Sequence, residues 1–332
     1  MKKLSFNIFS KYREVLMGLA ILSILIFHYT EDCYNASINY TGIVKLYKTY
    51  IGSSGVDVFL LLSGLGLYYS FSKNNNIKNF YIKRIKRVIV PYLILAIPVY
   101  IWYDFIYLSD GILGFIKNLF FITIFTNNNM LFWYIFFIII CYLIFPFIYK
   151  LINKSKDSVS IIKIISIIIV LIIGLFFINK FYPTFFSKTN IMLLRFIPFI
   201  LGILLGKFSF NNKKMKYYII IFILGLFSFL LVRFNLIYNR LFLFMFNLSI
   251  MFFIILIIDI ISKKKDIVIK PFSFLGKYSL EIYLVHVAIR KIIITYGYHN
   301  YKLGYYLIFI IVSIIISILF NLLIKKILRI KK

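Results

Sequence analysis

The chain has 332 residues and a formal net charge of +29, and 62% of its residues are apolar while only 15% are charged. Its mean hydropathy is +0.95. Soluble domains average about 45–50% apolar and about 25% charged residues. This composition excludes a soluble globular protein and predicts a protein whose surface faces lipid. Its two cysteines have no spacing typical of a metal site, so we expect no bound metal and no structural disulfide.

Apolar segments near the ~20 residues needed to cross a bilayer recur along the chain with short polar breaks. A further apolar segment, residues 112–125, is short and follows Asp110 and Gly111. We expect it to be interfacial or re-entrant, because a crossing here would invert the topology of every later helix. The fold class is therefore all-α, a polytopic integral membrane protein with a single membrane domain over residues 1–332. We predict about ten transmembrane helices, at residues 14–30, 55–72, 88–108, 131–150, 160–178, 191–207, 216–232, 241–262, 273–295 and 303–325.

The basic residues are distributed unevenly over the predicted loops. With a cytoplasmic N-terminus, 28 of the 39 Lys and Arg residues fall in inner segments and 10 in outer loops, while Arg195 lies within a span. This asymmetry follows the positive-inside rule, so we expect both termini in the cytoplasm and a multi-pass protein of the cell (plasma) membrane. Because topology and attraction to anionic lipid explain the basic charge, we expect the lipid bilayer as a partner and no nucleic acid.

Two polar residues near the outer ends of the first two predicted helices are candidates for chemistry, because polar groups at membrane depth are costly. His28 carries an imidazole that, when neutral, accepts a proton from a hydroxyl at physiological pH; a hydrogen bond between helices is its alternative role. Asp57 lies in the segment Gly52 to Leu65, whose small residues, Ser63 among them, permit close helix packing. Packing does not explain Asp57, which we expect to orient His28.

Three further residues lie in the second half of the chain. Arg195 is costly facing lipid, so we expect it to face inward, paired with Asp57 or with a ligand anion. His286 either lines a cavity or bonds a neighbouring helix. His299 falls in a predicted outer loop, where solvation is its expected role.

A basic run precedes the third predicted helix. It contains Lys83, Arg84, Lys86 and Arg87. Only eight of the 39 basic residues are Arg, and two of them stand here three positions apart, as neighbours on one helical face. Since arginine forms forked contacts to phosphate or carboxylate, this run is a candidate anion-binding site.

These residues belong to ordered segments that cover essentially the whole chain. The segments are Glu14 to His28, Gly55-Val-Asp-Val-Phe with Ser63-Gly64-Leu65, Arg84 and Arg87 before Pro91-Tyr92, Phe132-Trp133-Tyr134, Arg195 to Gly206, and Leu275 to His286. Together these segments resemble the membrane acyltransferases of family 3, which modify cell-surface sugars and include O-antigen and exopolysaccharide O-acetyltransferases.

The resemblance implies a membrane O-acyltransferase with His28 as its catalytic histidine. It implies an acyl-CoA co-substrate, by family habit acetyl-CoA, on the cytoplasmic side, a glycan acceptor on the far side and no bound cofactor. The acyl group would pass directly or through an acyl-histidine. One position departs from the family pattern: Met17 stands eleven residues before His28, where Arg or Lys is common. This departure favours the alternative, a polysaccharide exporter of the same fold. We predict catalytic roles for His28 and Asp57, donor binding by Lys83, Arg84 and Arg87, and a cavity lined by Ser63, Trp133, Arg195 and His286.

Overall fold

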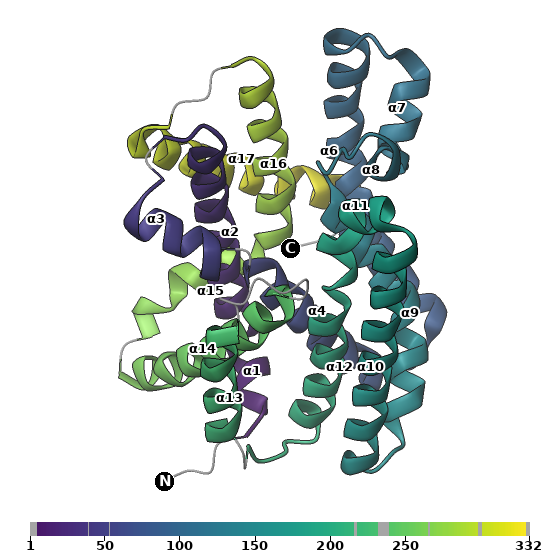
Figure 1. Ribbon diagram of the computed structural model, residues 1–332, viewed down its shortest axis with the longest axis vertical. Helices are drawn as coiled ribbons and strands as arrows, with labels where there is room; N and C mark the ends of the chain where they lie inside the picture. Colours follow the sequence, from purple (N-terminus) through teal and green to yellow (C-terminus); the bar gives the residue numbers. More distant parts are fainter. Residues whose placement is uncertain are drawn as a thin grey trace. The chain divides into compact units, whose positions relative to one another are not determined.

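The computed structural model describes residues 5–38, 40–52, 54–215, 218–231, 239–264, 266–297 and 301–329. Within these ranges every named element is a helix (Figure 1). The described residues also contain an isolated antiparallel β-bridge between Ser5 and Lys214. The predicted all-α fold class is therefore confirmed, and the chain is a multi-pass membrane protein.

The chain forms two compact units. Unit 1 comprises Met1–Asn74, Phe147–Ile164 and Leu194–Ser279, and unit 2 comprises Asn75–Pro146, Ile165–Leu193 and Leu280–Lys332. Each unit gathers three separate stretches of sequence, so residues far apart in the chain pack together within it. The single membrane domain expected from the sequence stays a prediction.

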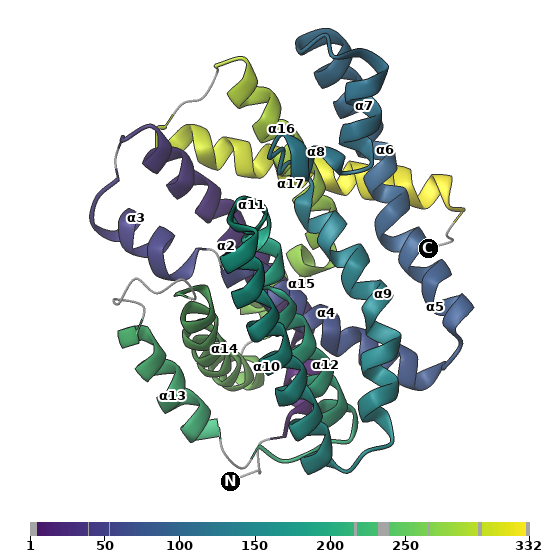
Figure 2. The ribbon, with the colours of Figure 1, turned by 45° about the vertical axis from the view of Figure 1, so that its right-hand side comes forward.

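Unit 1 is built on helix α2 (Arg13–Asn35), helix α4 (Ser54–Lys73) and helices from the second half of the chain. Helix α13 lies alongside α14 in both views (Figure 2). The remaining elements of this unit are α1 (Asn7–Lys11), α3 (Gly42–Leu46), a π-helical turn (Tyr47–Ile51), α12 (Phe196–Phe210), α13 (Tyr218–Leu231), α14 (Asn239–Lys264), a 3-10 turn (Asp266–Val268) and α15 (Lys270–Lys277).

Helices α4 and α12 pack at backbone distance because glycines line their interface. A Cβ added to Gly202 would lie 2.1 Å from the carbonyl oxygen of Leu61, and one added to Gly64 would lie 2.4 Å from that of Phe199. Gly206 follows Gly202 by four residues, the small-residue spacing that lets membrane helices approach closely. The contact pairs advance in the same direction along both helices, so α4 and α12 run parallel and bring their N-terminal ends together.

Helix α2 runs antiparallel to α4. Near its start, the Nε of Arg13 donates to the carbonyl oxygen of Leu62 over 3.1 Å. Near the end of α2, a Cβ added to Gly52 would lie 2.5 Å from the ring of Phe27. The end of α2 is therefore level with the residues that precede α4.

Unit 2 contains the basic run and the two last helices of the chain. Its elements are α5 (Ile77–Arg84), a π-helical turn (Ile85–Ile89), α6 (Val90–Ile101), a second π-helical turn (Trp102–Tyr107), α7 (Gly111–Leu119), α8 (Ile122–Thr126), α11 (Pro183–Leu193), α16 (Ser279–Thr295) and α17 (Leu303–Ile327). Helices α9 (Trp133–Asn153) and α10 (Asp157–Phe181) contribute residues to both units.

Eight of the ten predicted spans coincide with helical segments of the described chain that are long and apolar enough to cross a membrane. The span predicted at 216–232 contains α13, which has 14 residues, and it extends outside the described residues. The span predicted at 273–295 is broken at Tyr278, between α15 and the 17-residue α16. A helix of that length is at the lower limit for crossing hydrocarbon. The eight segments are Arg13–Asn35, Gly42–Lys73, Ile77–Tyr107, Trp133–Asn153, Asp157–Phe181, Pro183–Phe210, Asn239–Lys263 and Leu303–Ile327.

Segment 112–125 folds into the short helices α7 and α8, separated by Phe121 at φ 63°. Buried polar contacts hold it: the Nδ2 of Asn118 donates to Asp104 over 2.7 Å, and the hydroxyl of Thr123 donates to Asn118 over 2.6 Å. Helices of nine and five residues are too short to span the bilayer. The segment is therefore not a crossing helix, which agrees with the interfacial or re-entrant piece expected.

Candidate active site

His28 lies near the C-terminal end of α2, against a carboxylate of the same helix. Its Nδ1 is 3.1 Å from Oε2 of Glu31, which follows three residues later and so lies on the same helical face. The two side chains are 18% and 32% exposed, so a solute can approach them. A neutral imidazole that donates from Nδ1 has Nε2 as its basic nitrogen, and a carboxylate on Nδ1 stabilises the imidazolium formed when Nε2 takes a proton.

Asp57 is paired with Arg195 in the structure. The Nε of Arg195 donates to Oδ1 of Asp57 over 3.0 Å, and both side chains are buried. This is one of the two partners that the sequence left open for Arg195. A Cβ on Gly55, two residues before Asp57, would lie 2.6 Å from the carbonyl oxygen of Ala20, so this part of α4 packs against α2 near Ala20. The orientation of His28 by Asp57 therefore stays a prediction, and the partner that the structure gives Asp57 is Arg195.

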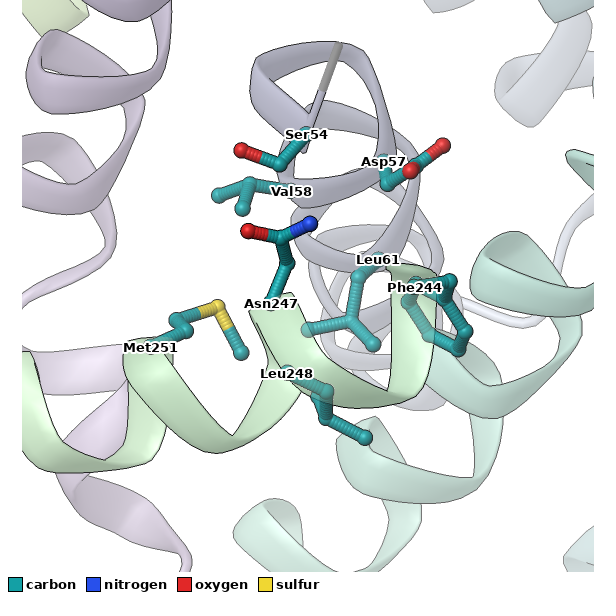
Figure 3. A pocket seen from close by; sticks show the side chains of 8 residues that line it. All are labelled: Ser54, Asp57, Val58, Leu61, Phe244, Asn247, Leu248 and Met251. Atoms are coloured by element: carbon teal, nitrogen blue, oxygen red, sulfur yellow. The ribbon is translucent and has the colours of Figure 1, made fainter. Parts of the chain in front are cut away.

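A small cavity lies beside Asp57 in unit 1. Its volume is about 10 Å³, roughly the space that one water requires, so it does not accommodate an acyl donor in this conformation. Figure 3 shows Asp57 and Ser54 on α4, opposite the side chains of α14. None of the four residues predicted to line a cavity lines this one, and Ser63 is partly exposed on α4. The lining residues are Ser54, Asp57, Val58, Leu61, Phe244, Asn247, Leu248 and Met251.

Arg240 joins this region although the sequence placed it in an outer loop. Helix α14 begins at Asn239, two residues before the predicted span, so Arg240 stands in its first turn. The charge of Arg240 interacts with those of Asp57 and Arg195. Asp57 lies on α4, Arg195 directly precedes α12 and Arg240 lies in the first turn of α14, so segments far apart in the sequence supply these three charged residues of unit 1.

The two arginines of the basic run diverge in unit 2. The guanidinium of Arg84 lies over the rings of Phe80 and Tyr142, with centroid distances of 5.5 and 5.9 Å. That of Arg87 lies instead 2.9 Å from Oε1 of Glu281. The sequence predicted one shared face from α-helical spacing, but a π-helical turn starts at Ile85, and its wider i→i+5 pattern rotates the two side chains apart. Lys83 is exposed.

Glu281 is fully buried and was not assigned a role from the sequence. Besides Arg87, it accepts a hydrogen bond of 2.9 Å from Nδ2 of Asn321 on α17. The sequence signal that could have identified Glu281 is a carboxylate within an apolar helix, where an ionisable group is costly. His286, also fully buried, lies with its Nδ1 2.7 Å from the carbonyl oxygen of Ile282, which fixes the imidazole to its own helix.

The aromatic residues of this unit connect His286 to the start of α9. The ring of Tyr283 lies 5.8 Å from that of His286 and 5.2 Å from that of Tyr134, which follows the predicted cavity residue Trp133. His299 lies outside the described residues. Among the residues that are described, no group of three His, Cys, Asp or Glu side chains is placed to hold a metal ion.

A sequence profile of acyltransferase family 3, described as an acyltransferase domain, matches residues 12–322 of the chain. The match covers nearly the whole sequence and confirms the resemblance seen in the ordered motifs. No significant match to a curated protein or to a solved structure was found.

Proposed function

Because the chain belongs to acyltransferase family 3, we propose that it is an O-acyltransferase of the cell membrane that acts on glycans. It takes an acyl group, acetyl in our proposal, from acyl-CoA in the cytoplasm. It transfers this group to a hydroxyl of a cell-surface or lipid-linked glycan. Acyl-CoA is a co-substrate, and the proposal requires no resident cofactor.

The pair of His28 and Glu31 is the observation that carries this proposal. The Nε2 of His28 takes the proton of the acceptor hydroxyl, whose oxygen attacks the thioester carbonyl. The C–S bond then breaks, and the departing thiolate takes the proton from the imidazolium. Glu31, 3.1 Å from Nδ1, stabilises that imidazolium. If the acyl group instead rests on His28 as an acyl-imidazole, the same carboxylate still orients the ring.

We assign binding of the acyl donor to Lys83, Arg84 and Arg87. Arg84 and Arg87 are held by different partners, aromatic rings for the first and the buried carboxylate of Glu281 for the second. Such contacts fix guanidinium groups that then meet the phosphates of the donor. In this proposal Asp57 is a positioning residue, because its partner is Arg195. Ser63, Trp133, Arg195 and His286 remain predicted cavity residues.

A polysaccharide exporter of the same fold is the second candidate. It is favoured by Met17, which stands where the family commonly has a cation. Arg13, one turn earlier on α2, does not replace that cation, because its Nε is bonded to the carbonyl oxygen of Leu62 on α4.

The test is acetyl transfer from labelled acetyl-CoA to surface glycan in membranes that contain the protein. The variants are His28→Ala and, as an equally expressed control, Lys326→Ala, whose side chain is exposed near the end of α17. We expect label with the wild type and the control and none with His28→Ala. Label that persists in His28→Ala would overturn the role of His28. Glycan export that requires the protein without any label would establish the exporter.

A further inference from the structure

An aromatic cluster of four rings lies in unit 2, where the second π-helical turn meets the end of α16. Its members are Trp102, Tyr103 and Tyr107 of that turn and Tyr296, which directly follows α16. The indole N–H of Trp102 donates to the hydroxyl of Tyr296 over 3.0 Å. The ring centroid of Tyr296 lies 5.8 Å from that of Trp102 and 6.2 Å from that of Tyr107. Two segments 194 positions apart in the chain therefore build one aromatic surface.

The π-helical turn brings the first three rings together. Residues five positions apart diverge by about 140° around an α-helix, because successive residues are about 100° apart. The wider i→i+5 pattern of a π-helix makes such residues neighbours, and turns of this kind are frequent at functional sites. The rings of Trp102 and Tyr107 accordingly lie 6.1 Å apart at an angle of 25°. Those of Tyr103 and Tyr107 lie 5.9 Å apart at 18°.

A cation borders the aromatic cluster, and part of the cluster is open to solutes. The ammonium of Lys291, near the end of α16, lies 4.5 Å from the ring centroid of Tyr103. Within the described chain, no hydrogen bond or ion pair engages this ammonium. Tyr107 and Tyr296 are 45% and 47% exposed. The cluster therefore offers ring surface beside a positive charge that has no carboxylate partner among the described residues.

An interfacial belt is the alternative explanation for these side chains, because tryptophan and tyrosine gather where a membrane meets water. A belt needs aromatic rings at one depth but no contact between them. In this cluster the N–H of Trp102 is bonded to Tyr296, and each ring contacts at least one other. These mutual contacts and the adjacent cation of Lys291 are features that a belt does not require.

A sugar ring has the chemistry that complements such a surface. The C–H groups on one face of a pyranose carry partial positive charge and pack against the negative face of an aromatic ring. An acidic sugar adds a carboxylate, which a lysine ammonium binds through charge-assisted hydrogen bonds. In the topology predicted from the sequence, the ends of spans 88–108 and 273–295 both lie on the outer side. This is the side of the proposed glycan acceptor.

We infer that the aromatic cluster, with Lys291 beside it, is a binding site for an acidic sugar of the acceptor glycan. The rings pack against the C–H face of the sugar, and Lys291 binds its carboxylate. The inference rests on the proposed function only for the source of the ligand, because binding requires neither the acyl donor nor His28.

The experiment measures the fluorescence of Trp102 in the purified full chain, reconstituted in lipid nanodiscs without acyl donor. Trp102 and Trp133 are the two tryptophans of the chain, so Trp133→Phe leaves Trp102 as the sole reporter. Trigalacturonate is titrated in one arm and the neutral maltotriose in the other. We expect a saturable change in emission with trigalacturonate and roughly tenfold or more weaker binding of maltotriose, which lacks the charge-assisted contact. No saturable change with either sugar overturns the inference.

Variants in the Trp133→Phe background locate the site. Lys291→Gln should weaken binding of trigalacturonate about tenfold or more and leave maltotriose unaffected. Tyr296→Ala removes a ring and should weaken both sugars. Tyr182→Ala is the control, because it removes a tyrosine that is 67% exposed outside the cluster, and it should bind as the background does. Unchanged binding in both Lys291→Gln and Tyr296→Ala overturns the site. If Trp133→Phe does not fold, the wild type is compared with Trp102→Phe, in which the sugar-dependent change should disappear.

Two further readouts separate this site from its alternatives. Nanodiscs with brominated acyl chains quench tryptophans that face lipid, so strong quenching of Trp102 without any response to sugar assigns the cluster to an interfacial belt and overturns the inference. Acetyl transfer is scored separately. Sugar binding by a wild type that does not transfer acetyl groups contradicts the proposed function and supports the site, whereas transfer without sugar binding contradicts the site alone.

Discussion

Helix α12 has a buried cation near each end, and the two differ in how their N–H groups are used. Near the C-terminal end, the Nζ of Lys207 donates to the carbonyl oxygens of Ile152 and Ser155 and to the hydroxyl of Ser160, over 2.5–2.6 Å. All three of its protons are occupied. At the N-terminal end, the Nε of Arg195 donates to the carboxylate of Asp57 over 3.0 Å.

The comparison shows that burial of a charge does not by itself indicate function. Lys207 satisfies carbonyl groups at the end of α9 and joins α9, α10 and α12 within unit 1, which is a structural task. A cation near a helix C-terminus is also favoured by the helix dipole. At the other end, Arg195 is buried against the carboxylate of Asp57, to which the proposed function assigns a positioning role.

The largest expected effect on stability is that of Asp57→Asn. It leaves Arg195 buried without its carboxylate, which costs about 3–5 kcal/mol. The free energy of unfolding in detergent is the measurement. The matched control is Asp157→Asn, whose partner Lys213 lies 2.7 Å away in an exposed pair that should contribute less than about 1 kcal/mol. Equal losses in the two variants would contradict the account of the buried pair.

Lys207→Met should have the next largest effect. It removes three hydrogen bonds to a charged group, and the loss is partly offset because no charge is then buried, which leaves about 2–3 kcal/mol. Acetyl transfer per folded molecule should stay at the wild-type level. Lys163→Met is the control, because that amine bonds Leu151 and Ser155 at an exposed site. An unchanged stability of Lys207→Met would refute the structural role of Lys207.

Gly202→Ala tests the packing that aligns the two ends of α12 with α4. The added Cβ would meet the carbonyl oxygen of Leu61 at 2.1 Å, so the helices must separate, at a cost of about 1–3 kcal/mol. In Gly174→Ala, by contrast, nothing lies within 4 Å of the new methyl group, and the helix propensity of alanine should stabilise α10 by roughly 0.5–1 kcal/mol. The signs of the two changes in unfolding free energy should therefore be opposite.

Glu31→Gln should have the smallest effect on stability, within about 0.5 kcal/mol, because the pair with His28 is partly exposed. Its effect should appear in catalysis. Loss of the charge that stabilises the imidazolium should lower kcat about tenfold or more while the KM for the donor stays unchanged. A wild-type kcat would remove Glu31 from the mechanism, and a changed KM alone would assign it to binding.

The helices were largely predictable from the sequence, since the bilayer imposes the length of an apolar segment. The predicted spans 55–72 and 241–262 differ from α4 and α14 by at most two residues at each end. Those two residues mattered, because they moved Arg240 from an outer loop into a helix. The break at Tyr278 escaped prediction because it accompanies a tertiary contact: a Cβ on Gly276 would lie 1.9 Å from the carbonyl oxygen of Glu14.

The candidate site was only partly predictable, because a side chain's partner depends on which helices become neighbours. The pairing of Glu31 with His28 could have been predicted from the sequence, because a residue three positions after His28 lies on the same helical face. Arg87 and Glu281, which form a pair, are 194 positions apart in the chain. A local sequence pattern therefore does not predict their contact. The divergence of Arg84 from Arg87 follows from a π-helical turn that apolar periodicity does not reveal.

The most direct test of the account compares acetyl transfer per folded molecule in the double variant Asp57→Asn with Arg195→Gln and in Lys207→Met. Neutralising both members of a buried pair removes the unpaired charge, so the double variant should fold better than Asp57→Asn alone. The account predicts that this double variant folds yet transfers little, while Lys207→Met is less stable yet transfers normally. Normal transfer by the double variant together with loss of transfer in Lys207→Met would contradict the division between a functional and a structural end of α12.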